Sequence, residues 1–280
     1  MTRLNCVLVP LDGSECGEAA LNWAQTLPSQ RIRLLRICSP ENPDREAAMR
    51  YLEDVAARLR QPGCEIETRV AVGDPAEGIV GDAADADLVV MCTHGTGGGG
   101  RLLFGSVADR VARHAPVPTL LLRGGSHPVT TESVRRLVVP LDGSPAAERS
   151  LVLTQLLARM LNVPVHLVTV DESMTSDESM EDGAQAHGDI KDAPASISES
   201  TSTYLEQTAD SLRTAEIPTS SEVRSGPAAL EVMATLEHGD LLILTTHGQG
   251  AARRWQIGNV AEKLLRQAAA PVVLVRADVS

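Results

Sequence analysis

The sequence repeats itself, and this duplication limits the folds that the chain can adopt. The string VPLDGS occurs at residues 9–14 and again at 139–144, with an offset of 130 residues. Residues 87–123 align without gaps to residues 240–276, with an offset of 153 residues. A repeat of this length is a duplicated domain and not the short period of a solenoid. With 280 residues in total, each copy has enough chain to bury a core of its own.

Apolar runs and helical periodicity alternate within the first copy. The predicted strands are residues 7–9, 32–37, 64–72, 88–92 and 119–122. The predicted helices are residues 14–27, 45–60, 75–84 and 106–114. Strands that alternate with helices indicate parallel βαβ units with right-handed crossovers. The second copy repeats this order from Leu137 to Val275, so the sequence predicts two tandem α/β domains.

The two copies differ in length, which indicates where the domains begin and end. We expect domains at 1–124 and 136–280, joined by a short polar linker at 125–135. The second copy is 23 residues longer, which is the difference between the two offsets, and the excess falls within residues 171–200. This segment is rich in Ser, Asp and Glu, so its composition predicts a mobile acidic loop. Because it follows a strand, it should emerge at the carboxyl ends of the strands, where a lid or a partner-docking element is a further hypothesis.

Composition argues against several classes of function. The formal net charge is −12, which makes the chain a poor general binder of nucleic acids or anionic membranes. Aromatic residues make up only 2%, too few for a base-stacking platform. No apolar run approaches the ~20 residues that cross a bilayer, and the first residues show no signal-peptide pattern. The five cysteines lack a C-x-x-C motif, as is typical of free thiols in a reducing cytoplasm. We therefore expect a cytoplasmic protein without a metal centre, a nucleic-acid partner or a membrane span.

Two segments in each copy follow predicted strands and carry groups that could bind a nucleotide. In open α/β sheets, ligands bind at the carboxyl ends of the strands. Asp12 follows the first strand and could meet a ribose or Mg²⁺, or it could only cap the next turn. A glycine-rich loop follows the fourth strand and leads to the start of a helix, whose free N–H groups attract anions. Arg101 could add a charge-assisted contact to phosphate. Cys92 could be a redox-responsive thiol or a buried thiol at the strand end.

Two better-known nucleotide motifs do not fit this loop. Residues 95–100 satisfy G-x-G-x-x-G, but they follow the fourth strand and not the first, and the second copy lacks them. Residues 100–106 lack the lysine of a P-loop. Without that lysine, phosphoryl transfer has no obvious catalyst.

The loop resembles the nucleotide-binding motif of the universal stress protein family, which is Gly-x-x-Gly, nine residues, and then Gly-Ser or Gly-Thr. Residues 92–106 read Cys-x-x-Gly, nine residues, Gly-Ser, so only the first glycine is replaced. Residues 245–259 read Thr-x-x-Gly, nine residues, Gly-Asn, so the first glycine and the final hydroxyl residue are both replaced. A side chain at Cys92 or Thr245 could crowd the ribose or the α-phosphate. The resemblance covers essentially the whole chain, apart from the acidic segment.

This resemblance implies two flavodoxin-like or Rossmann-like domains, each a five-stranded parallel sheet with helices on both faces. It implies ATP as a ligand, with Mg²⁺ carried by the nucleotide. In the first copy, Asp12 would meet the ribose and Ile37 would pack near the adenine. The implied binding residues of that copy are Pro10, Asp12, Ile37, Met91, Cys92, Gly95, Arg101, Gly105, Ser106 and Val107. Their counterparts in the second copy are Pro140, Asp142, Thr245, Gly248, Gly258, Asn259 and Val260.

The resemblance also implies a regulatory role and a way for the domains to associate. Fifth strands of the family often pair edge to edge, so residues 119–123 and 272–276 would form an internal pseudo-dimer, and a homodimer is a further option. We expect a stress-response protein that binds ATP in its first domain without a committed enzymatic step. Two alternatives remain open: a nucleotide-free scaffold that binds a partner, and slow ATP hydrolysis.

Overall fold

The computed structural model describes residues 3–41, 43–59, 63–93, 104–123, 133–172, 193–246 and 257–277. The strands of the first half are β1 (Leu4–Pro10), β2 (Ser29–Cys38), β3 (Glu65–Val72), β4 (Leu88–Cys92) and β5 (Thr119–Leu122). Its helices are α1 (Glu15–Thr26), α2 (Arg45–Arg58), α3 (Pro75–Ala83) and α4 (Ser106–His114). The predicted elements of the first copy are confirmed, and the bounds of β4, α4 and β5 are those expected from the sequence.

The second half repeats this order. Its strands are β6 (Arg136–Pro140), β7 (Val165–Asp171), β8 (Thr219–Ser225), β9 (Asp240–Thr245) and β10 (Val272–Val275). Its helices are α5 (Pro145–Glu148), α6 (Ser150–Leu161), α7 (Ala193–Thr214), α8 (Ala228–Thr235) and α9 (Asn259–Gln267). The segment after β6 forms two consecutive helices, where the first half has the single helix α1.

Several helices begin where the sequence provides a capping side chain. Ser14 starts α1 and accepts a hydrogen bond from the Gly17 amide, and Asp74 does the same for α3 from the Glu77 amide at 2.9 Å. Pro75 follows Asp74 at the first helical position, where its missing N–H costs nothing. Such caps satisfy amide groups that a helix start otherwise leaves unpaired.

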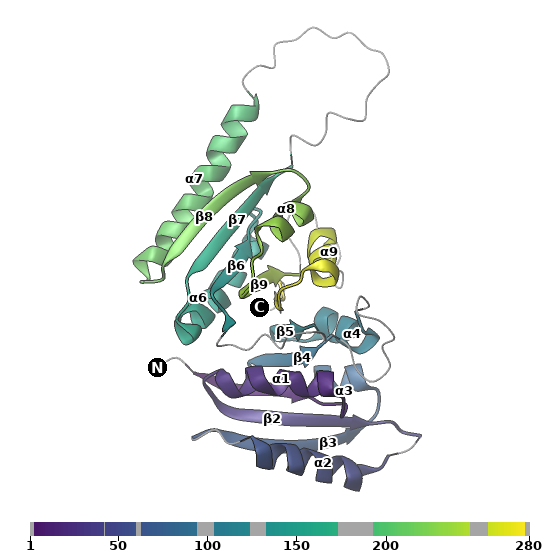
Figure 1. The fold of residues 1–280 in the computed structure, drawn as a ribbon. Coiled ribbons are helices and arrows are strands. Elements are labelled where there is room, and N and C mark those ends of the chain that lie inside the picture. Colours follow the sequence, from purple (N-terminus) through teal and green to yellow (C-terminus); the bar gives the residue numbers. More distant parts are fainter. Residues whose placement is uncertain are drawn as a thin grey trace, which may run out of the picture.

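The ten strands in the described part of the chain form one continuous sheet in the order β3-β2-β1-β4-β5-β10-β9-β6-β7-β8 (Figure 1). Within each half the paired strands are parallel, and helices cover both faces, as the sequence predicts. The order 3-2-1-4-5 matches the first five strands of the Rossmann arrangement. The chain order reverses between β1 and β4, and between β6 and β9, and the carboxyl ends of these strands are where such sheets bind ligands.

The two halves meet through their fifth strands. β5 and β10 pair antiparallel, with Leu120 opposite Val273 and Leu121 opposite Val272. The edge pairing expected for residues 119–123 and 272–276 is thus present, and it leaves neither fifth strand as an open edge. Because the pair is antiparallel, the carboxyl ends of the strands in one half point to the opposite edge of the sheet from those in the other.

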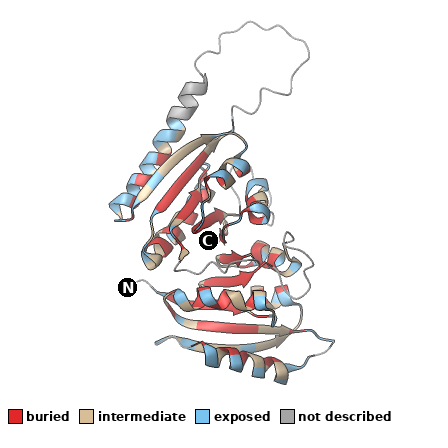
Figure 2. Cartoon of the chain, viewed as in Figure 1, coloured by how far each residue is buried: buried red, intermediate tan, exposed pale blue. Residues whose placement is uncertain are grey.

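Two apolar layers run along the sheet, one on each face, and both continue from one half into the other. The first layer packs under α1, α2, α6 and α7 and includes Trp23, Leu120 and Val273. The second packs under α3, α4, α8 and α9 and includes Leu121 and Val272. The central strands are buried almost throughout, whereas the outer strands β3 and β8 are half-exposed (Figure 2). The ten strands therefore share one pair of cores across the junction.

Helices α4 and α9 exchange polar contacts over this junction. Arg113 on α4 pairs with Glu262 on α9 at 3.6 Å, and Arg266 on α9 pairs with Asp109 on α4 at 3.8 Å. Arg276 also donates to the backbone oxygen of His114 at 3.4 Å. Arg113 and Arg266 are separated by the 153-residue offset, and so are Asp109 and Glu262. The contacts are therefore reciprocal, which ties the two helices together in matching positions.

The acidic segment differs from its prediction at both ends. The expected loop covered residues 171–200, but Asp171 is the last residue of β7 and residues 193–200 already belong to α7. Residues 173–192 lie outside the described residues. Ser and Thr have only moderate helix propensity, so composition indicated a loop where the chain continues as the helix that packs on β7 and β8. This part of the prediction is wrong.

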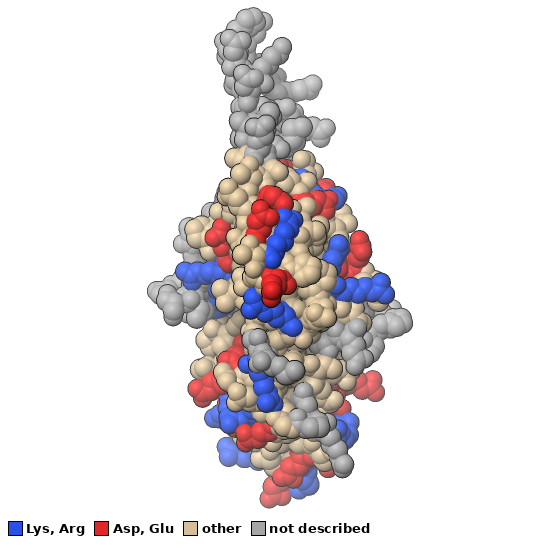
Figure 3. Space-filling model, turned by 90° about the vertical axis from the view of Figure 1, so that its left-hand side faces the viewer, with Lys and Arg blue, Asp and Glu red and all other residues tan. Residues whose placement is uncertain are grey.

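Charged side chains on the described surface are mixed in sign. On the face drawn in Figure 3, acidic and basic groups lie next to one another. The pairs include Arg213 with Glu206 and Asp210, and Arg224 with Glu222 and Glu231. Among the described helices, none is long and apolar enough to cross a membrane.

Candidate functional site

The turn after β1 presents an oriented carboxylate. Asp12 Oδ1 accepts hydrogen bonds from the Ser14 amide at 3.0 Å and from the Ser14 hydroxyl at 2.6 Å. Gly13 has φ +80°, a conformation that side chains disfavour, so glycine is required there. Asp12 therefore orders the following turn, which was one of the two roles considered for it. The residue is nevertheless exposed, so its carboxyl group is fixed at the surface of the sheet edge.

The second half builds the same turn. Asp142 Oδ1 accepts from the Ser144 amide at 3.0 Å, and the Ser144 hydroxyl accepts from the Ala147 amide at 3.1 Å. Gly143 has φ +75° and Asp142 is exposed, as in the first copy. The turn geometry is therefore duplicated together with the sequence.

The end of β4 closes the glycine-rich loop at its base. The Thr93 amide donates to the Leu122 oxygen, and the Thr93 oxygen accepts from the Gly105 amide, both at 2.8 Å. In the second half, the Thr246 oxygen accepts from the Gly258 amide at 2.7 Å. In each half, the strand end and the start of the following helix are thus joined by a backbone hydrogen bond. Neither threonine was among the predicted site residues, although the tripeptide THG, which begins with this threonine, occurs in both copies.

Helices α4 and α9 begin at this base without a capping side chain. Their N-cap residues are Gly105 and Gly258, and neither start has a side-chain cap hydrogen bond. Ser106 and Asn259 are exposed at the first helical position. The first amide groups of each helix therefore retain donor capacity for an anion, and the helix dipole favours negative charge there.

Met91 and Cys92 lie on opposite faces of β4. Met91 packs in the layer under α3 and α4, whereas Cys92 packs in the layer under α1. The Cys92 thiol donates to the backbone oxygen of Cys16. A hydrogen bond with the Cys16 side chain, together with burial, raises the pKa of Cys92 far above its ordinary value. The sulfur therefore sits in the core as a protonated thiol, which argues against a redox-responsive role.

Alkylation of the native protein should distinguish Cys92 from the more accessible cysteines. Cys64 is half-exposed, whereas Cys92 is buried and held protonated. Because the thiolate is the reactive form, we expect iodoacetamide to modify Cys64 at least about tenfold faster than Cys92. Peptide mass spectrometry after a timed pulse measures both rates, with the urea-unfolded protein as the control in which the rates converge. Equal rates in the native protein would contradict the buried position of Cys92.

Ile37 lies at the carboxyl end of β2, next to β1. It is half-buried, and a Cβ atom added to Gly78 would lie 2.6 Å from Ile37 Cδ1. The glycine in α3 therefore leaves the space that this side chain fills. Ile37 thus contributes an apolar surface on the α3 side of the sheet, near the carboxyl end of β2.

The other predicted residues occupy the following positions. Pro10 and Pro140 are half-buried at the ends of β1 and β6, and Thr245 is half-buried at the end of β9. Val107 is half-buried, and Val260 is exposed. Gly95, Arg101 and Gly248 lie outside the described residues. In the part of the chain that the structure describes, no cluster of His, Cys, Asp and Glu side chains could hold a metal ion.

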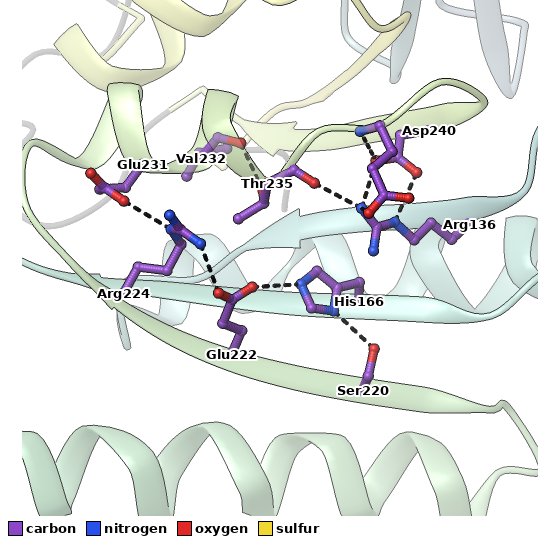
Figure 4. A network of polar contacts seen from close by, with 10 residues as sticks. Arg136, His166, Ser220, Glu222, Arg224, Glu231, Val232, Thr235 and Asp240 are labelled. Carbon is purple, nitrogen blue, oxygen red and sulfur yellow. Dashed lines mark hydrogen bonds and ion pairs between the residues drawn. The ribbon is translucent and has the colours of Figure 1, made fainter.

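A separate polar network crosses the second half of the sheet (Figure 4). His166 on β7 contacts the Ser220 hydroxyl at 2.8 Å and Glu222 at 3.3 Å, and Glu222 continues to Arg224 at 2.8 Å. Arg136 binds Asp240 at 2.8 Å. Arg136 and Asp240 are the first residues of β6 and β9, so this end of the network lies opposite the carboxyl ends. We interpret the network as structural, since it satisfies polar groups under α8 and is not part of the candidate site.

Comparisons with known proteins agree with this architecture. The sequence model of the universal stress protein family matches residues 5–123 and 133–276. Universal stress proteins of Mycolicibacterium smegmatis and of Mycobacterium tuberculosis strain H37Rv are each 22% identical, over 299 and 292 residues, and cover 96% of this chain and 96% of their own. The crystal structure of a universal stress protein from Archaeoglobus fulgidus has a TM-score of 0.76 at 18% identity, covering 98% of both chains. Because the family model matches both halves, the chain belongs to the universal stress protein family as a tandem two-domain member.

Proposed function

We propose that this chain binds ATP, or a related adenine nucleotide, as a regulatory ligand of a cytoplasmic stress response. The observation that carries the proposal is the uncapped start of α4, which lies at the base of the glycine-rich loop and follows a strand next to the Asp12 turn. Ser106 and Val107 would hold phosphates through their amides, and Gly105, whose own amide is bonded to Thr93, would let the phosphates approach the backbone closely. Asp12 would lie at the ribose and Ile37 near the adenine. Mg²⁺ would enter with the nucleotide.

The first domain is the stronger candidate for this ligand. Ser106 keeps the hydroxyl of the family motif, whereas Asn259 replaces it in the second domain. The Cys92 sulfur packs in the core under α1, so the fold accommodates this replacement of the first glycine of the motif. The acidic segment of the second domain adds negative charge to that half, and this raises the electrostatic cost of a bound phosphate there.

We propose that the two domains, residues 1–124 and 136–280, act as an internal pseudo-dimer whose conformation responds to the nucleotide. A ligand shifts such an equilibrium only if it binds one state more tightly than another. The reciprocal contacts between α4 and α9 offer a physical link, because α4 starts at the first candidate site and α9 at the second.

Equilibrium dialysis with labelled ATP tests both whether the protein binds ATP and whether it leaves the bound ATP unhydrolysed. Nucleotide-stripped full-length protein should retain ATP saturably in the presence of Mg²⁺, and the retained label should stay on intact ATP, because the loop lacks a P-loop lysine. Unlabelled ATP added in excess serves as the displacement control. If the protein retains no labelled ATP, it does not bind the nucleotide. Steady release of phosphate would favour the alternative of slow hydrolysis.

A further inference from the structure

The two tyrosines of the chain occupy equivalent positions. Tyr51 and Tyr204 are separated by the 153-residue offset, and Glu18 and Glu148 by the 130-residue offset. Tyr51 on α2 donates a hydrogen bond to Glu18 on α1 at 3.0 Å. Burial and the nearby Glu148 carboxylate raise the pKa of Tyr204 to about 12. The duplication has therefore kept the tyrosine and the glutamate in both domains, but the buried Tyr204 hydroxyl has no hydrogen-bond partner among the described residues.

In the first domain this pair supports the Asp12 turn through an arginine. The Arg36 guanidinium lies over the Tyr51 ring, 5.2 Å from its centroid. A Cβ atom added to Gly13 would lie 3.0 Å from Arg36 Nη1, so the guanidinium packs against the turn. Arg36 Nη1 is buried and has no hydrogen-bond partner among the described residues. Stacking therefore holds the guanidinium between the aromatic ring and the turn.

The second domain lacks this support. Pro10 pairs with Leu35, and Pro140 pairs with Val168, so the next residues, Arg36 and Thr169, correspond to each other. Thr169 is only 5% exposed, and its hydroxyl has no hydrogen-bond partner among the described residues. A threonine is too short to reach from β7 to the turn as a guanidinium does. The second domain therefore lacks a counterpart of Arg36 at this position of the sheet.

We propose that Arg36, stacked on Tyr51, is a positioning residue that holds the Asp12 turn in the conformation that receives the nucleotide. This inference rests on the proposed function and extends it, because it names the residue that makes the first site stronger than the second. Arg36 acts through the turn and need not touch the ligand. Its planar face matters as well as its charge.

Two pairs of variants separate positioning from charge. Arg36→Thr copies the second domain and should weaken ATP binding at the first site about tenfold. Arg36→Lys keeps the charge but has no planar face, so it should not restore full affinity. Tyr51→Leu removes the ring and should reproduce Arg36→Thr, whereas Tyr51→Phe keeps the ring and should stay close to wild type. Arg50→Thr is the matched control, since it removes an exposed arginine from the same helix as Tyr51.

Amide hydrogen exchange gives a readout that needs no nucleotide. The Ser14 amide is bonded to Asp12 Oδ1, so a loosened turn should exchange this proton about tenfold faster in Arg36→Thr and Tyr51→Leu, but not in Arg50→Thr. Wild-type affinity and exchange in Arg36→Thr, or full rescue by Arg36→Lys, would overturn the positioning role while leaving ATP binding intact. If the wild-type protein binds no ATP but the exchange rates change as expected, the proposed function fails and the support of the turn stands.

Discussion

Gly105→Asp should abolish ATP binding in the first domain without weakening the fold. Gly105 is the N-cap of α4 with φ −65° and ψ 145°, so its backbone accepts a side chain. Aspartate is a better N-cap than glycine by a few tenths of a kcal/mol, and its carboxylate would occupy the amides that the phosphates need. Replacing an anion site by a fixed negative charge should lower affinity by about 100-fold or more. Calorimetric titration with ATP measures this loss, and thermal unfolding measures stability.

Two controls make this prediction specific. Gly105→Asn adds a neutral cap of the same size and should weaken binding less than aspartate does. Gly258→Asp makes the same change at the start of α9 and should leave the tighter ATP site in place. If Gly105→Asp binds ATP like the wild type, the start of α4 is not the phosphate site. If Gly258→Asp removes the tighter site instead, the assignment to the first domain is wrong.

Of the substitutions proposed here, Leu120→Ala should cause the largest loss in the free energy of unfolding. Leu120 is 1% exposed and lies opposite Val273 where the two halves join. Emptying such a position costs about 2–5 kcal/mol in the free energy of unfolding. Because both apolar layers continue across the junction, we expect the loss to appear in the unfolding of both halves.

Leu230→Ala is the matched control for this substitution. Leu230 on α8 is 47% exposed, so the same change should alter the unfolding free energy by no more than about 0.5 kcal/mol. Urea denaturation followed by circular dichroism compares the two variants. Equal losses of unfolding free energy in the two variants would contradict the importance of this position. Two separate unfolding transitions in Leu120→Ala, only one of them weakened, would contradict a core shared across the junction.

The sequence was a good guide to elements whose pattern is local. β4 and β5 are short apolar runs buried on both faces, and α4 begins directly after a glycine, so their bounds could be predicted. The Asp12 turn could also be anticipated, because its aspartate, glycine and serine bond to one another within the turn. The internal duplication gave these predictions further support, because each pattern occurs twice in the sequence.

Features that depend on distant contacts could not be predicted. The direction of the Cys92 side chain follows from the register of β4 and from the position of α1, which no local pattern specifies. The acidic segment runs into α7, a helix whose later residues Leu205, Ala209 and Leu212 are buried in the core, and the composition of the segment did not indicate this. Arg36, Tyr51 and Glu18 come from three separate elements, so only their arrangement in space shows that they form one unit.

Calorimetric titration of the nucleotide-stripped full-length protein with ATP and Mg²⁺ tests the central claim most directly. We expect saturable binding with one tight site per chain, because the first domain keeps Ser106 and the Arg36 support while the second lacks both. Two equally tight sites would contradict the preference for the first domain. If no heat of binding is detected at any of several temperatures, the result contradicts nucleotide binding itself and favours the partner-binding scaffold.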